Sequence, residues 1–166
     1  MLDITQVFDG TPPTTGVAIT ATRVSTNVID ALVARDEGAG NMLQFSVLVM
    51  TTFTTTNAAT LQVQFETCST AGGTYLPLIL SPVIAASNLI AGTNLTYLVP
   101  RNGPNDMTSG ILGAPGQFLR LTYTVGTGVF SAGAVMAWLA ASPDANTYAS
   151  YTNNYVASFA AASLNF

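Results

Sequence analysis

The sequence contains no histidine and no lysine, and charged residues of any kind are scarce. Four basic and eight acidic residues give a formal net charge of −4, and charged residues make up 7% of the 166 positions, against about 25% in an ordinary soluble domain. A nucleic-acid-binding surface needs clustered cations that displace counterions. The basic residues are only Arg23, Arg35, Arg101 and Arg120, so we expect no nucleic-acid partner.

The missing residue types also argue against an enzyme. Histidine is the commonest general base and metal ligand, and a serine–lysine pair needs a lysine. Cys68 is the single cysteine and lies in a regular strand pattern, which is typical of a small strand residue. Asp30, Asp36 and Glu37 could form a carboxylate cluster, but a calcium site needs more oxygen ligands at defined spacing. We therefore expect no catalytic activity, no cofactor and no metal.

Long hydrophobic runs are absent as well. Residues 76–86 are interrupted by Pro77, Ser81 and Pro82, and residues 129–141 are too few for a span of about 18 to 20 apolar residues. We expect no membrane partner. The chain fills its polar positions with Thr, Ser, Asn and Gln, and this predicts a surface that is largely covered by other protein. The alternative is simply a neutral β-protein surface.

The hydrophobic pattern predicts an all-β protein. In residues 61–68, Leu61, Val63 and Phe65 alternate with polar residues, and this period of two places them on one face of a strand. Residues 118–125 alternate in the same way, with Arg120 on the outer face. Counting similar segments gives about eight strands, which favours an antiparallel jelly roll or β-sandwich. The predicted strands cover residues 17–22, 28–33, 43–50, 61–68, 75–80, 95–99, 118–125 and 132–140.

Glycine-containing turns separate these strands. Gly72 and Gly73 predict a hairpin loop, and VGTG at residues 125–128 predicts a tight hairpin between two strong strands. Residues 1–16 show little periodicity and predict an extended N-terminal arm. Residues 17–141 form the predicted jelly-roll domain, and residues 142–166 form an extended C-terminal arm.

The predicted C-terminal arm carries aromatic residues at spacings of three, four and four: Tyr148, Tyr151, Tyr155 and Phe159. We expect them to anchor the arm on a protein surface, because a rigid amphipathic ring buries area at low entropic cost. A sugar-binding platform is the alternative. We expect removal of residues 142–166 to weaken attachment to that protein surface and to leave a folded domain.

The few charges concentrate in residues 25–38, which include Asp30, Arg35, Asp36 and Glu37. The turn glycines Gly38 and Gly40 follow directly. We therefore expect Arg35 to pair with Asp30 or Asp36 and to fix the turn that leaves the second predicted strand.

The stretch STNVIDALVARDEGAG, residues 25–40, resembles the capsid cement (decoration) proteins of tailed bacteriophages, of the podovirus type. FTTTNAATLQVQFET from residue 53, VPR from residue 99 and FLRLTYTVGTGVFSAG from residue 118 fit the same family in the same order. The resemblance covers roughly residues 17–141 and departs from the pattern at residues 102–116 and after Tyr155.

The resemblance implies a jelly roll on the outer surface of the phage head, assembled in the host cytoplasm. There it would bridge neighbouring major capsid proteins and stabilise the shell, as a homo-oligomer with a trimer favoured over a dimer. The alternative is a head or tail appendage that binds host glycans. The candidate structural and interface residues are Asn27, Asp30, Arg35, Asp36, Arg101, Arg120, Tyr148, Tyr151, Tyr155 and Phe159.

Overall fold

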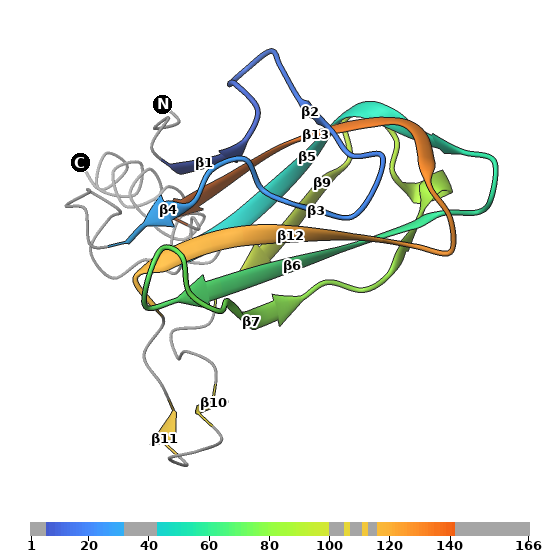
Figure 1. Cartoon of the computed structure of the whole chain (residues 1–166). Coiled ribbons are helices and arrows are strands. Elements are labelled where there is room, and N and C mark those ends of the chain that lie inside the picture. Colours follow the sequence, from blue (N-terminus) through green and yellow to red (C-terminus); the bar gives the residue numbers. More distant parts are fainter. Residues whose placement is uncertain (1–5, 32–42, 100–104, 107–110, 113–115, 142–166) are drawn as a thin grey trace, which may run out of the picture.

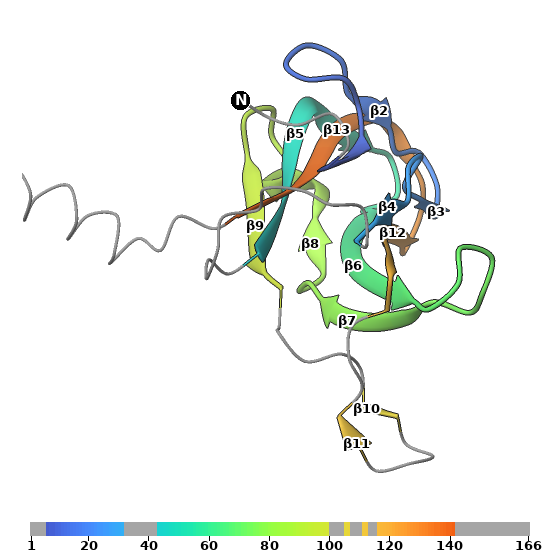
Figure 2. The same cartoon turned by 90° about the vertical axis from the view of Figure 1, so that its left-hand side faces the viewer.

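The computed structural model describes residues 6–31, 43–99, 105–106, 111–112 and 116–141. These residues form two packed antiparallel sheets, seen edge-on in Figure 2, and a separate two-stranded sheet from residues 105–106 and 111–112. The strands are β1 (Val7–Asp9), β2 (Val17–Ala18), β3 (Arg23–Val24), β4 (Ile29–Asp30), β5 (Leu43–Thr55), β6 (Thr60–Cys68), β7 (Leu76–Leu80), β8 (Ile84–Ala85), β9 (Asn94–Leu98), β10 (Asn105–Asp106), β11 (Ile111–Leu112), β12 (Phe118–Gly126) and β13 (Phe130–Ala141). A short 3₁₀ helix, η2 (Ala86–Asn88), precedes β9.

The strand order is that of a jelly roll. One sheet runs β1-β13-β5-β9, with β2 also on β13, and the other runs β3-β12-β6-β7, with β4 on β12 and β8 on β6. β1 and β2 lie along the same side of β13, β3 and β4 along the same side of β12, and β7 and β8 along the same side of β6. Each sheet therefore has four positions and the sandwich has eight. Each of the eight predicted strands matches one position, which confirms the all-β sandwich. Figure 1 shows β12 and β6 in front of β13, β5 and β9, with the pair β10-β11 projecting from one end.

Alternation of side chains builds the core between the sheets. The inward residues of β6 and β12 are buried, as the period of two predicts. The Phe45 and Phe65 rings stack across the two sheets with their centroids 5.2 Å apart, and Phe53 meets Phe130 edge-on at 4.8 Å. Such pairs contribute about 0.5–1.5 kcal/mol beyond their buried area.

Residues 6–16 are not an arm, which corrects the prediction for this part of residues 1–16. β1 pairs with β13, and Phe8 is fully buried with its ring edge-on to Phe65 at 6.0 Å. After β1 the chain turns at Gly10, whose φ of +87° favours glycine. A strand of three residues is too short to show periodicity, yet burying a side chain as large as Phe8 contributes about 2–3 kcal/mol.

The two predicted turns have different outcomes. β6 and β7 pair antiparallel, which confirms the hairpin around Gly72 and Gly73. The prediction for residues 125–128 was wrong, because β12 pairs with β6 whereas β13 pairs with β5. The connection therefore crosses from one sheet to the other. The same turn residues can form a hairpin within one sheet or a crossing between two sheets. Thr127 adopts a φ of +66° within this connection.

Candidate binding surface

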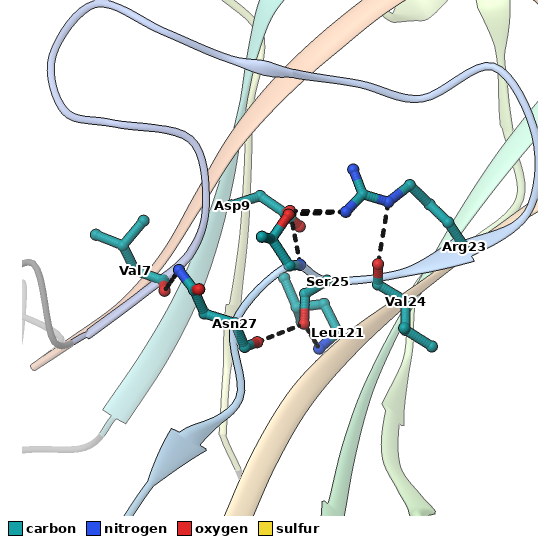
Figure 3. A network of polar contacts seen from close by, with 8 residues as sticks. Val7, Asp9, Arg23, Val24, Ser25, Asn27 and Leu121 are labelled. Atoms are coloured by element: carbon teal, nitrogen blue, oxygen red, sulfur yellow. Dashed lines mark hydrogen bonds and ion pairs between the residues drawn. The ribbon is translucent and has the colours of Figure 1, made fainter.

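A buried polar corner joins the two sheets at one edge of the sandwich. Asp9 of β1 is fully buried, and its Oδ1 accepts hydrogen bonds from the Thr26 main-chain N at 2.9 Å and the Thr26 Oγ1 at 2.7 Å. Arg23 Nη2 forms an ion pair with the same oxygen at 3.2 Å. Figure 3 shows Asp9 of β1 and Arg23 of β3 directed toward one another. The corner thus ties the first strand of one sheet to the edge of the other.

Ser25 and Asn27 complete the corner (Figure 3). Ser25 Oγ donates to the Asn27 carbonyl at 2.8 Å and accepts from the Leu121 main-chain N at 3.1 Å. Asn27 Nδ2 donates to the Val7 carbonyl at 3.1 Å, and its main-chain N donates to the Phe8 carbonyl at 2.9 Å. The segment between β3 and β4 therefore takes the place of a regular strand partner for β1, and the predicted interface role of Asn27 stays a prediction.

Tyr123 lies against this corner from the core side. Burial raises the pKa of Tyr123 well above its ordinary value of 10.0, and the negative charge of Asp9 raises it further. Asp9 Oδ2 and the Tyr123 hydroxyl are buried and have no hydrogen-bond partner among the described residues. A buried polar atom without a partner costs about 1–3 kcal/mol, so the tyrosine is held neutral at a cost to stability.

The ion pair at the corner differs from the predicted one. Asp30 lies on β4 and accepts a hydrogen bond from Gln117 Nε2 at 3.0 Å. Arg35 and Asp36 lie outside the described residues, so the predicted pairing of Arg35 stays a prediction. The ion pair that the structure shows near this stretch joins Asp9 to Arg23. It links residues 14 positions apart, and no local sequence signal connects them.

Arg120 is the centre of a second polar cluster, on the outer face of the β3-β12-β6-β7 sheet. It lies opposite Glu66 across β12 and β6, and its Nε is 2.7 Å from Glu66 Oε2. Gln64 Nε2 donates to the other carboxylate oxygen at 2.8 Å. The guanidinium carbon lies 3.9 Å from the centroid of the Tyr75 ring. Burial raises the pKa of Tyr75, and the charge of Arg120 opposes that shift.

The outer face of the β1-β13-β5-β9 sheet is different in character, because its outward positions carry no charge. We call it the uncharged face. Trp138 and Leu48 are only half-buried and are not part of the core cluster, whereas their neighbours Ala137, Leu139, Val47 and Val49 are. Leu98 of β9 is 51% exposed. The face consists of Val7, Gln44, Ser46, Leu48, Met50, Asn94, Thr96, Leu98, Ala134, Met136, Trp138 and Ala140. Of these outward residues, Val7, Ser46 and Met136 are already buried within the single chain.

Sequence reasoning missed the main features of both surfaces. Asp9 was assigned to an arm, and Trp138 was only one residue of a predicted strand. The signal for Trp138 was present, because it is the only tryptophan of the chain and alternates with the apolar residues Ala137 and Leu139. The other predicted interface residues lie outside the described residues: Arg101, Tyr148, Tyr151, Tyr155 and Phe159.

Two further properties of the described residues bear on other functions. They contain no group of three or more His, Cys, Asp or Glu residues placed to hold a metal ion. In the same part of the chain, no helix is long and apolar enough to cross a membrane. Cys68 is buried at the end of β6, as expected of a small strand residue.

Comparison with known proteins gives one family. No curated protein matches the sequence. The family model named Bbp16 matches residues 14–139, which is most of the chain and includes the polar corner from Arg23 to Asn27 and nearly all of the uncharged face. The name indicates a bacteriophage protein. The chain belongs to the Bbp16 family.

Proposed function

We propose that this protein is a capsid cement protein of a tailed bacteriophage, which binds the outer surface of the head and bridges neighbouring major capsid proteins. The observation that carries the proposal is the uncharged face. A sheet face whose outward positions include Trp138, Leu48 and Leu98, and no charged residue, is suited to burial against protein.

The use of charge elsewhere supports the same function. Two of the four arginines, Arg23 and Arg120, are in ion pairs within the molecule. Those charges hold the corner and the outer face of the other sheet, so they contribute to rigidity. A rigid sandwich loses little conformational entropy when it docks, and this favours binding.

Cementing itself is multivalent binding. One copy that touches two neighbouring capsid subunits converts the second contact into an intramolecular one, so modest contacts add up to stable attachment. On this proposal the uncharged face supplies the apolar centre of the contact, where an aromatic residue such as Trp138 contributes most.

Binding to purified, expanded phage heads tests the proposal. Leu48→Glu places a charge in the middle of the uncharged face, and Thr124→Glu places the same charge on the exposed outer face of β12 as a matched control. Burial of an unpaired charge costs several kcal/mol, so we expect head affinity to fall at least about 100-fold for Leu48→Glu and to be unchanged for Thr124→Glu.

Equal binding by the two variants would overturn the role of the face, and failure of the unmodified protein to bind heads would overturn the function. Glycan-array binding without head binding would favour the appendage alternative. Circular dichroism and thermal unfolding show whether each variant is folded, and both side chains lie outside the core cluster.

A further inference from the structure

Among the residues that the structure describes, β9 is the last strand on one side of its sheet. It pairs with β5 in a regular register from Gln44↔Leu98 to Leu48↔Asn94. Figure 2 shows no labelled strand beyond it. The Val99 main-chain N bonds to the Leu43 carbonyl, and the Val49 N bonds to the Thr93 carbonyl. Because main-chain groups alternate along an antiparallel strand, Asn94, Thr96 and Leu98 direct their N–H and C=O groups away from β5.

The other three borders of the sandwich are protected in ways that β9 is not. β7 contains Pro77 and has a register shift against β6. β3 and β4 have two residues each, and β1 and β2 are separated by a loop and a register shift. Proteins use proline, bulges, charges and very short strands to prevent pairing at an edge. β9 has five residues, NLTYL, without proline, charge or register shift.

We propose that β9 pairs antiparallel with β9 of a second copy of this chain, about a two-fold axis that passes near Thr96. Antiparallel pairing of a strand with itself satisfies two-fold symmetry directly. Thr96 then lies opposite its own counterpart, and Asn94 lies opposite the counterpart of Leu98. A charged residue at position 96 would lie opposite the same charge in the second copy and would oppose pairing. β9 contains no charged residue.

The pairing also buries apolar surface that a single copy leaves open. Leu95 and Tyr97 are half-buried and pack against the core cluster, with Tyr97 stacked on Phe45 at 5.2 Å. A second β9 would cover their outer edges and would join Leu95 to the counterpart of Tyr97 as a stabilising cross-strand pair. Exposed Leu98 gains a neighbour as well.

The dimer has a consequence for attachment that rests on the proposed function. Joining two sheets at β9 makes their uncharged faces continuous, so one dimer presents two equivalent docking surfaces. The arrangement is a dimer, in contrast to the trimer expected from the resemblance. Its test needs only the purified chain, so its failure is distinguishable from failure to bind heads.

Light scattering after size-exclusion chromatography, with the full-length chain, tests the proposal. We expect the unmodified protein to have twice the chain mass of 17.2 kDa. Thr96→Pro removes an edge-facing N–H and leaves the bonds to β5, because proline is tolerated where the N–H points away from the sheet. Thr96→Val is the matched control, because it loses the same hydroxyl, 3.2 Å from Ser46 Oγ, and keeps the N–H.

We expect Thr96→Pro to raise the dimer dissociation constant at least about tenfold and Thr96→Val to leave it unchanged. If the proline variant does not fold, Thr96→Lys places two like charges opposite one another at the axis and is expected to give monomers. Slow hydrogen exchange at the Thr96 amide, lost on dilution, provides an independent readout. A monomeric or trimeric unmodified protein, or a dimer that survives both edge variants, would overturn the proposal.

Discussion

Arg120 and Glu66 face one another across β12 and β6, with Nε 2.7 Å from Oε2, on the outer face of the sheet that carries the charges. The Glu66 residue is only 6% exposed, although its position on β6 alternates outward. Gln64 donates a hydrogen bond to Glu66, and the Tyr75 ring lies against the guanidinium of Arg120. Because the Glu66 carboxylate is so enclosed, its negative charge depends on Arg120 for compensation. Replacing Arg120 therefore tests how much this ion pair contributes to stability.

Arg120→Ala should lower the free energy of unfolding by about 2–4 kcal/mol, because it leaves the buried Glu66 charge without its partner. The double variant Arg120→Leu with Glu66→Leu should lose less than the single variant, since no charge remains uncompensated. Urea unfolding followed by circular dichroism measures both. If the single variant is the more stable of the two, the ion pair does not have the role that its geometry indicates.

Asp9→Ala should destabilise the protein by about 3 kcal/mol, because Arg23 and the Thr26 main-chain N lose their acceptor at a buried site. Asp9→Asn retains an acceptor oxygen and should lose less. Thr124→Ala is the control, since Thr124 is exposed on the outer face of β12. Denaturant midpoints rank the three variants, and an effect of Asp9→Ala no larger than that of Thr124→Ala would contradict the importance of the corner.

Asn27→Ala should loosen β1 specifically. Its side chain holds the Val7 carbonyl, so the substitution removes a hydrogen bond between the corner and β1 and should cost about 1–2 kcal/mol. Hydrogen exchange should accelerate at β1 amides before it changes at β6 and β12. Uniform acceleration throughout the sandwich would instead mean that β1 does not open separately from the rest.

Tyr123 should make the protein sensitive to alkali. Its folded-state pKa is raised above the ordinary value of 10.0, so above about pH 10 the unfolded chain releases a proton that the folded chain retains. This contribution to stability is complete below that pH and declines as the pH rises. Tyr123→Phe should remove the decline and, because it deletes a buried hydroxyl that has no partner among the described residues, should raise the free energy of unfolding near neutral pH by about 1–3 kcal/mol.

Unfolding of both proteins in urea at about pH 8 and about pH 11 measures this effect. All other residues are the same in the two proteins, so the difference between them isolates Tyr123. An equal loss of stability in the variant and in the unmodified protein would contradict the assignment.

Much of the fold could be predicted from the sequence, and the reason is visible in β6 and β12. Alternation along each strand assigned Leu61, Val63 and Phe65 to the core and Arg120 to the outer face, because side chains on a strand have a period of two. All eight predicted strands are present. β1 was missed because three residues carry too little periodic signal, and its burial depends on Asn27 and Asp9 meeting the other sheet.

Pairing was harder to predict than the strands themselves. The turn at residues 125–128 has the glycines of a hairpin but crosses between the sheets. Local turn chemistry fixes how the chain reverses and does not fix which strand lies beside it. The Asp9–Arg23 pair was missed for a related reason, since it depends on β1 and β3 lying on adjacent edges of the two sheets.

The sequence by itself determined that this chain forms strands, which residues of each strand face the core, and that too few charges exist to cover its surface. Only the tertiary structure decided where those charges are absent. Strand order places β13, β5 and β9 side by side, and their outward residues then combine into one uncharged face that includes Trp138. Alternation gives each strand two faces, but neighbours in a sheet are chosen by contacts between residues far apart in the chain.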